Sequence, residues 1–120
     1  MLPKNLGKLG ERLALKYLQN KDYQLITQNF RCRLGEVDLI LRDKKQIVFV
    51  EVKTRFSKKY GLPEEAVTAS KQTSIIKTAN YFLLLHPKLS DCFRIDVIAI
   101  ELEPKTSKLT AVRHYKNITL

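Results

Sequence analysis

The side chains in this chain that could do chemistry fall within two neighbouring β-strands expected near its middle. Side chains alternate along a strand, so Glu36 and Asp38 share one face of the first strand. By the same rule, Glu51 and Lys53 share one face of the second strand. A two-residue turn at Lys44–Lys45 would place Asp38 opposite Glu51, and Glu36 would then lie opposite Lys53. Carboxylates directly across two strands repel each other, so something must offset the repulsion between Asp38 and Glu51.

A divalent cation would offset this repulsion, because Mg²⁺ binds carboxylate and carbonyl oxygens together with water and substrate phosphate. Asp38 and Glu51 would be ligands, and the backbone carbonyl of Val52 is a candidate third ligand. The Lys53 ammonium could hold the attacking water or the scissile phosphate, or stabilise negative charge at phosphorus. The pattern is typical of phosphodiester hydrolysis. The alternative is a solvent-facing hairpin end with ion pairs worth ~0 to 1 kcal/mol each.

The net charge indicates an anionic partner. The chain has 120 residues, with 22 Lys and Arg against 12 Asp and Glu, and a formal charge of +10. Residues 1–60 carry 14 of the basic side chains and 6 of the acidic ones, so the positive charge is concentrated there. A hydrophobic content of 44% argues against a disordered basic tail. A nucleic acid is therefore the expected partner, and the alternative is a merely solvated basic surface.

The cysteines and histidines indicate no metal or redox site of their own. Cys32 and Cys92 lack a nearby Cys or His at ligand spacing, so they are expected to be buried thiols. His86 and His114 are expected at the surface or in turns. No apolar stretch approaches the ~20 residues of a membrane span, so we expect no membrane partner and a soluble, cytoplasmic protein.

The hydrophobic pattern predicts two helices and five strands in one domain, residues 1–120, because no repeat or linker divides the chain. A basic loop, Thr54–Pro63, is expected between the third strand and the second helix. The order α-β-β-β-α-β-β implies a mixed sheet with helices packed against it. The expected elements are helices Leu6–Gln19 and Thr68–Leu85, and strands Tyr23–Phe30, Glu36–Arg42, Ile47–Lys53, Phe93–Leu102 and Lys108–Tyr115.

Several short strings resemble the bacterial YraN-like family of small uncharacterised proteins over almost the whole chain. That family is similar to the restriction-endonuclease-like nucleases of the PD-(D/E)xK type, which include archaeal Holliday-junction resolvases. The resemblance implies an α/β, restriction-endonuclease-like fold, with a mixed central β-sheet flanked by helices. The strings are Gly10-Glu11, Asn29-Phe30-Arg31, Gly35-Glu36-Val37-Asp38-Leu39-Ile40, Val48-Phe49-Val50-Glu51-Val52-Lys53-Thr54-Arg55 and Arg94-Ile95-Asp96-Val97.

The resemblance also implies roles for the acidic residues. Asp38 and Glu51 would bind the metal, and Lys53 would be the catalytic lysine. Glu11 resembles the glutamate that completes the acidic site from the first helix in the resolvase branch, and it is a further candidate ligand. Its alternative role is an exposed helix residue paired with a nearby lysine. Glu36 is also a possible ligand, although the motif is degenerate beside it, where Val rather than Pro precedes the aspartate.

Basic residues near these acids are candidates for phosphate contacts, and two aromatic residues of the expected loop, Phe56 and Tyr60, could stack on unpaired bases. Asp96 is expected to form a structural pair with Arg94 or another neighbour. The candidate nucleic-acid-binding residues are Arg31, Arg33, Arg55, Lys58, Lys59 and Lys71.

Three hypotheses follow for the function. The first is a Mg²⁺- or Mn²⁺-dependent endonuclease acting on DNA, including branched or single-stranded DNA. The second is a non-catalytic nucleic-acid-binding protein that keeps the nuclease fold, and the third is an RNA- or ribosome-associated basic protein. One active site cuts one strand, so cleavage of a duplex or a four-way junction would need a homodimer.

Overall fold

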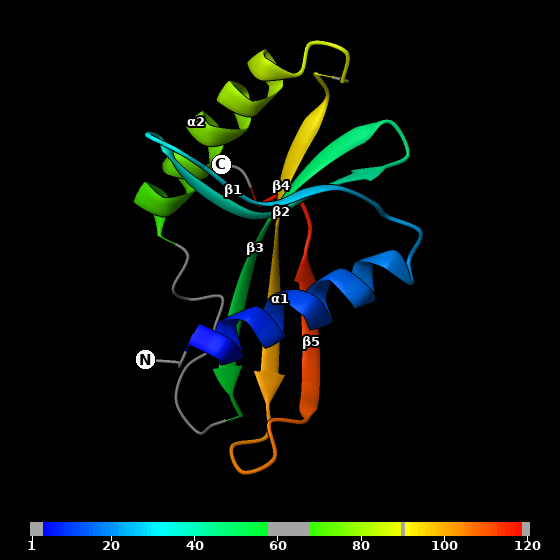
Figure 1. Ribbon diagram of the computed structural model, residues 1–120, viewed down its shortest axis with the longest axis vertical. Helices are drawn as coiled ribbons and strands as arrows, with labels where there is room; N and C mark the ends of the chain where they lie inside the picture. Colours follow the sequence, from blue (N-terminus) through cyan, green and yellow to red (C-terminus); the bar gives the residue numbers. More distant parts are fainter. Residues whose placement is uncertain (1–3, 58–67, 90, 119–120) are drawn as a thin grey trace.

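The computed structural model describes residues 4–57, 68–89 and 91–118, which form a five-stranded sheet and two helices (Figure 1). The observed order α-β-β-β-α-β-β confirms the expected mixed α/β fold. In chain order, the elements are α1 (Lys4–Gln19), β1 (Gln24–Cys32), β2 (Gly35–Asp43), β3 (Gln46–Phe56), α2 (Ala69–Leu85), β4 (Phe93–Leu102) and β5 (Leu109–Tyr115).

The sheet is mixed because a single strand pair is parallel. The spatial order is β1-β2-β3-β4-β5, and β3 pairs with β4 in parallel while the other neighbours pair antiparallel. Parallel neighbours need a crossover connection, and α2 lies in the segment that joins β3 to β4. The amino-terminal end of α2 therefore follows the carboxyl-terminal end of β3 along the chain.

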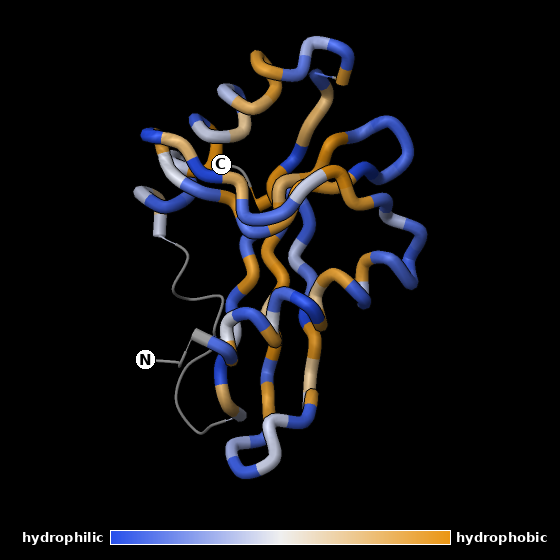
Figure 2. Tube along the Cα trace, viewed as in Figure 1, coloured by the Kyte–Doolittle hydropathy of each residue, from blue (hydrophilic) through white to orange (hydrophobic). Residues whose placement is uncertain are grey.

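The two helices cover opposite faces of the sheet, as the alternation of β3 shows. Val48 and Val50 belong to the core cluster that includes α1, whereas Ile47 and Phe49 belong to the cluster that includes α2. Hydrophobic residues accordingly follow the central strands and hydrophilic residues occupy the turns (Figure 2). Each large apolar side chain buried in this way contributes about 1.5 to 3 kcal/mol to the free energy of unfolding. These two clusters hold β3 in place between the helices.

Two strands continue at least two residues beyond the carboxyl-terminal ends that the sequence pattern predicts. β1 continues to Cys32, which pairs with Gly35 across the Arg33-Leu34 turn. β3 continues to Phe56, although the residues from Thr54 onward were expected in a loop. Pairing with β4 explains this difference, because parallel partners are available as far as Phe56. From Lys58 onward, the expected loop, with Lys59 and Tyr60, lies outside the described residues.

A close approach between Gly10 and Thr54 seats α1 on β3 beside the candidate site. A methyl group added at Gly10 would lie 1.9 Å from Thr54 Oγ1 and 2.8 Å from Thr54 Cβ. A methyl group added at Gly7, one turn earlier, would meet no heavy atom within 4 Å. Glycine is therefore required at Gly10 for packing rather than for its backbone conformation.

We expect Gly10→Ala to lower the free energy of unfolding by about 1 to 3 kcal/mol, because α1 must move away from β3. Gly7→Ala is the matched control and should be neutral or stabilising by up to ~1 kcal/mol, since alanine is the better helix former. Urea denaturation of both variants measures the difference. Equal effects at the two positions would contradict the close packing.

A buried polar network joins β4 to three other parts of the fold. The Arg94 guanidinium donates five hydrogen bonds, two to Asp96 and one each to Tyr23, Asp43 and Gln46, so all five of its N–H groups are used. Arg94 is 8% exposed and Asp96 is fully buried. The expected pairing of Asp96 with Arg94 is thus confirmed, with Nε and Oδ1 separated by 3.0 Å.

Two predictions for the histidines and cysteines are wrong. His114 lies inside this network rather than at the surface, with Nε2 2.7 Å from Asp96 Oδ2 and a side chain that is 6% exposed. Its place on β5 beside β4 turns the ring toward the core. Cys92 is exposed and Cys32 is half-buried, because both lie at the ends of strands. Within the described residues, neither helix combines the length and the hydropathy needed to cross a membrane.

Candidate metal and nucleic-acid site

The candidate site lies where β2 and β3 separate. Their antiparallel ladder runs from Asp43–Gln46, next to the predicted Lys44–Lys45 turn, to Leu39–Val50. This register confirms the prediction, since one further step places Asp38 opposite Glu51. The backbone ladder ends at the Leu39–Val50 pair. Beyond it, Val52 N–H donates a 2.7 Å hydrogen bond to the Asp38 side chain, at Oδ2.

The same hydrogen bond orients the Val52 carbonyl. The N–H and C=O groups of one strand residue point toward the same neighbouring strand. Because Val52 N–H points toward Asp38, its carbonyl also faces the opening between β2 and β3. The orientation of the Val52 carbonyl is compatible with the predicted role of a third oxygen ligand.

Glu51 is the buried carboxylate of the site, and two lysines compete for it. Its side chain is 7% exposed, and Oε2 lies 3.3 Å from Lys53 Nζ and 3.6 Å from Lys71 Nζ. Lys53 is two residues further along the same strand face, as predicted. Lys71 comes from the first turns of α2, which the fold brings over β3. Lys71 was predicted to contact a phosphate group. In the structure it instead forms an ion pair with Glu51.

Negative charge accumulates around Asp38. Burial, and then the nearby Glu51 carboxylate, raise the pKa of Asp38 to about 7, with smaller contributions from Glu11 and Glu36 and an opposing one from Val52 N–H. Burial and Glu36 also raise the pKa of Glu11, while Lys8 acts in the opposite direction. A bound cation would relieve both effects. Glu11 is thus within electrostatic range of the other acids, and it forms no ion pair with another described residue.

The acids do not form one compact metal cage. Within the described residues, no three Asp, Glu, His or Cys side chains come close enough together to hold one ion. Glu36 pairs with Arg31 (Oε2 to Nε, 3.0 Å), not with Lys53 as the extended register had predicted. The reason is that β2 has left β3 at this point and pairs with β1, where Glu36 is the partner of Arg31.

The candidate oxygen donors where the β2–β3 ladder ends are Asp38, Glu51 and the Val52 carbonyl. Mg²⁺ is usually held by one or two carboxylates and keeps several waters, so this donor set fits the ion without a third carboxylate. Glu11 and Glu36 add negative charge within electrostatic range of Asp38. The metal fit therefore rests on the chemistry of two carboxylates and one carbonyl at the strand opening.

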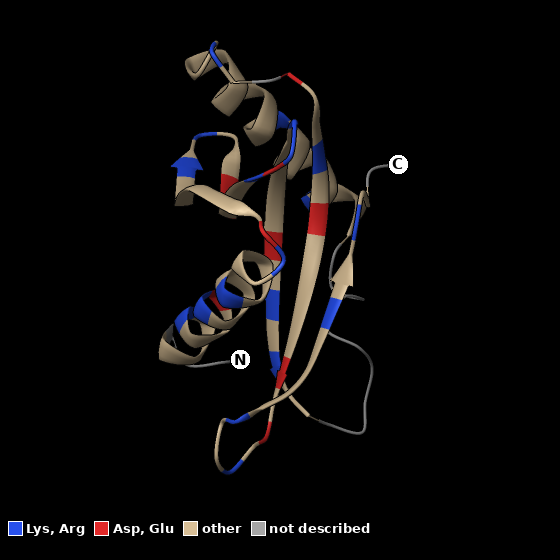
Figure 3. Cartoon of the chain, turned by 90° about the vertical axis from the view of Figure 1, so that its right-hand side faces the viewer, with Lys and Arg blue, Asp and Glu red and all other residues tan. Residues whose placement is uncertain are grey.

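The predicted nucleic-acid-binding residues are spread over several elements. Lys and Arg lie along α1 and on the strands next to the acidic positions (Figure 3). Arg31 pairs with Glu36, Arg55 is exposed near the end of β3, and Arg33 lines a hollow beside α2. The structure therefore brings Lys53 and Lys71 to Glu51 and leaves Arg33 and Arg55 outside that cluster.

The sequence predicted Lys71 as a phosphate contact but not its pairing with Glu51, and it gave no indication of the residues around Arg33. The available signal for Lys71 was topological, because a crossover helix that follows β3 begins near the end of that strand. No local motif marks Ser74 or Lys77, which line the hollow with Arg33. Their position depends on how α2 packs, which periodicity alone does not determine.

Fold and site together define a mixed α/β protein with paired carboxylates and a lysine at a strand opening. The chain belongs to the uncharacterised protein family UPF0102, whose model matches residues 10–100. The resemblance to the YraN-like family is thereby confirmed.

Relatives of this family match nearly the full length of the chain. A UPF0102 protein of Geobacter metallireducens is 46% identical over 114 residues, covering 95% of this chain and 91% of the relative. One of Clostridium botulinum strain Hall is 44% identical over 117 residues, covering 95% and 93%. One of Caldanaerobacter subterraneus subsp. tengcongensis is 43% identical over 114 residues, covering 95% and 93%.

Proposed function

We propose that the protein is a Mg²⁺- or Mn²⁺-dependent endonuclease that hydrolyses phosphodiester bonds in DNA, including branched or single-stranded DNA. The observation that carries the proposal is that Asp38 lies within electrostatic range of Glu51, whose carboxylate pairs with Lys53, where β2 and β3 separate. The likeness of the YraN-like family to PD-(D/E)xK nucleases supports the same assignment. A divalent cation bound by the two carboxylates would activate water and neutralise phosphate charge.

The side chains of the site would each have a separate role in this reaction. Asp38 is held in place by Val52 N–H through Oδ2, which would leave Oδ1 as the oxygen for the cation. Positive charge near Glu51 would weaken the ion pairs that Lys53 and Lys71 form with this carboxylate, because the negative charge of Glu51 would already be neutralised. Lys53 would then donate hydrogen bonds to a phosphate oxygen and stabilise charge in the transition state. Cleavage of both strands would require a second copy of the chain.

The test is a cleavage assay with purified protein. Branched, single-stranded and double-stranded DNA are incubated with Mg²⁺ or Mn²⁺, and parallel reactions contain EDTA. The expected result is cleavage of at least one DNA form with metal and none with EDTA. Absence of cleavage with every substrate and both metals would overturn the proposal.

A non-catalytic nucleic-acid-binding protein is the second candidate function. The observation that favours it is that Glu51 is already neutralised by two lysines, while no three metal-binding side chains cluster in the described residues. Salt titration of DNA binding tests this candidate: the logarithm of the affinity should fall with the logarithm of salt concentration with a slope near −0.9 per phosphate contacted in a duplex. Binding with this slope but without cleavage would favour the second candidate.

A further inference from the structure

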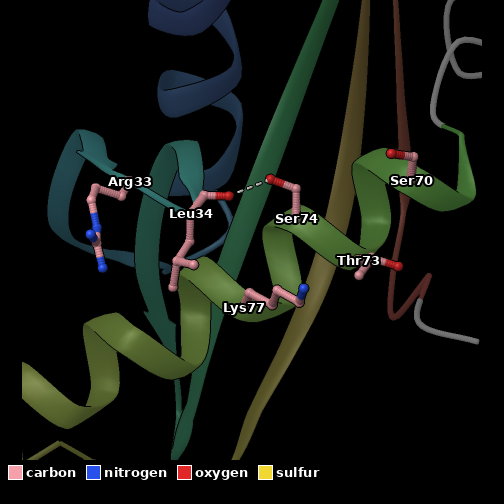
Figure 4. Close-up of a pocket in the computed structure, with 6 residues that line it drawn as sticks. All are labelled: Arg33, Leu34, Ser70, Thr73, Ser74 and Lys77. Carbon is pink, nitrogen blue, oxygen red and sulfur yellow. Dashed lines mark hydrogen bonds between the residues drawn. The ribbon is translucent and has the colours of Figure 1, made fainter.

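A hollow beside α2 provides a second set of basic and hydroxyl groups. It has a volume of about 480 Å³ and lies between the β1–β2 turn and the exposed side of α2 (Figure 4). Among the described residues that line it, two carry positive charge, three carry hydroxyl groups and none is acidic. The lining residues are Arg33, Leu34, Ser70, Thr73, Ser74 and Lys77.

We infer that this hollow binds the phosphate backbone of a single nucleic-acid strand that continues into the Glu51 site. The inference rests on the proposed function for the identity of the ligand as a nucleic acid. Arg33 and Lys77 match the charge of phosphate groups, and the Ser70 hydroxyl can donate a hydrogen bond to a phosphate oxygen. The Thr73 and Ser74 hydroxyls already donate to the carbonyls of Ala69 and Leu34. The part of the lining that the structure describes thus carries two cations and no carboxylate, which suits an anionic ligand.

The wall of the hollow is held against α2. Ser74 Oγ donates a 2.8 Å hydrogen bond to the carbonyl of Leu34, which Figure 4 shows bridging the turn and the helix. Gly35 follows with φ of 150°, and a methyl group there would lie 2.3 Å from Ser74 Oγ and 3.0 Å from Thr78 Oγ1. Glycine is thus required for this close approach. The turn is therefore seated on α2, so the hollow is preformed in the free protein.

The hollow adjoins the acidic site through Lys71. Residues three apart are neighbours on a helix surface, so Ser74 at the edge of the hollow lies next to Lys71. Lys71 Nζ is 3.6 Å from Glu51 Oε2. The rise along the helix axis from Lys71 to Lys77 is ~9 Å at 1.5 Å per residue. A strand could thus contact both the hollow and the acidic site over a short length.

A neighbouring smaller hollow favours a single strand over a duplex. It shares Arg33 and Leu34 with the first hollow and is bounded on α2 by Tyr81, which is 39% exposed. Positive grooves combined with accessible aromatic rings are typical of single-strand binding, since every unpaired base has a face for stacking. Bases within a duplex are stacked on one another and are not available to Tyr81.

Binding is measured by fluorescence anisotropy with labelled single-stranded and duplex DNA in EDTA, so that cleavage plays no part. The double variant Arg33→Gln/Lys77→Gln should bind single strands at least 10-fold more weakly. Its salt slope should fall by ~1.4, or about 0.7 for each of two phosphates. Tyr81→Ala should weaken single-strand binding about 5-fold or more, with little change in the salt slope.

The control variant Lys105→Gln/Lys108→Gln removes the same charge from the β4–β5 turn, at the far end of the molecule from α2 (Figure 1). Circular dichroism melting verifies that every variant is folded. Equal losses in the control and in Arg33→Gln/Lys77→Gln would overturn the inference and leave the proposed function standing, as would equal effects of Tyr81→Ala on single strands and duplexes. Failure of the unaltered protein to bind any DNA in EDTA would also overturn the inference, whereas the cleavage assay with metal decides the proposed function separately.

Discussion

Asp38→Asn is expected to abolish metal-dependent cleavage and at the same time to make the metal-free protein harder to unfold. The carboxylate is a proposed metal ligand, and asparagine keeps its size and its ability to accept the hydrogen bond from Val52 N–H. The neutral amide cannot supply the charge that a divalent cation requires. Cleavage should therefore fall about 100-fold or more, comparable to the loss of one group that stabilises developing charge.

The gain in stability follows from the raised pKa of Asp38. Burial and Glu51 move this pKa from 3.8 to about 7, so ionisation of Asp38 opposes folding. Below pH 3.8 the Asp38 carboxyl is neutral in both the folded and the unfolded protein, so its ionisation does not lower the free energy of unfolding. Between pH 3.8 and about 7 the cost grows as pH rises, and above pH 7 it is constant. At its largest, this cost to the free energy of unfolding is about 4 kcal/mol. We therefore expect Asp38→Asn to raise the free energy of unfolding by about 2 to 4 kcal/mol at pH 8.

Urea unfolding in EDTA at pH 5 and pH 8 measures this gain. The difference in unfolding free energy between Asp38→Asn and the unaltered protein should be larger at pH 8 by about 2 kcal/mol. Asp22→Asn is the control, because it removes the same charge from an exposed residue whose φ of 70° asparagine tolerates. A protein that becomes less stable at pH 8 through Asp38→Asn would contradict the prediction.

Lys53→Ala separates catalysis from metal binding. This variant should lose cleavage as Asp38→Asn does, yet it should keep or strengthen Mn²⁺ binding, because a cation competing for Glu51 is removed. Mn²⁺ titration followed by electron paramagnetic resonance gives the affinity. Loss of Mn²⁺ binding in Lys53→Ala would mean that the lysine positions Glu51 rather than serving the reaction.

Asp96→Ala is expected to lower the free energy of unfolding by about 3 to 5 kcal/mol, the largest effect on stability that the structure indicates. Asp96 is fully buried, which opposes its ionisation. Hydrogen bonds from His114, Arg94 and Asn117 N–H nevertheless hold its pKa below the ordinary value. Removal of the carboxylate would leave the Arg94 charge buried with less compensation.

A double-mutant cycle isolates the Arg94–Asp96 pair. Arg94→Met alone and Asp96→Ala alone should each be strongly destabilising, whereas the double variant should lose much less than the sum of the two. Asp96→Asn keeps the shape of the side chain and serves as a milder variant if Asp96→Ala fails to fold. Urea denaturation followed by far-ultraviolet circular dichroism gives the free energies of unfolding. Additive effects of the two single variants would contradict the assigned coupling.

Local patterns predicted most of the strands because their residues are apolar at a period that suits one structure. β4 was predicted with its observed bounds, Phe93–Leu102, since a run of β-branched residues between polar segments is a strong strand signal. The register between β2 and β3 was equally local, because the two-residue turn determines which residues face each other. The residue at which β3 ends could not be predicted from the local sequence. It depends on pairing with β4, which lies across α2 in the chain.

The sequence by itself therefore determined the element order, the opposition of Asp38 to Glu51 and the position of Lys53 on the same strand face as Glu51. Only the tertiary structure decided that Lys71 also reaches Glu51, because the rotation of α2 is set by the packing of its buried residues against the sheet. The same packing places Ser74 against the β1–β2 turn. Contacts of this kind join residues far apart in the chain, and side-chain packing rather than local propensity selects them.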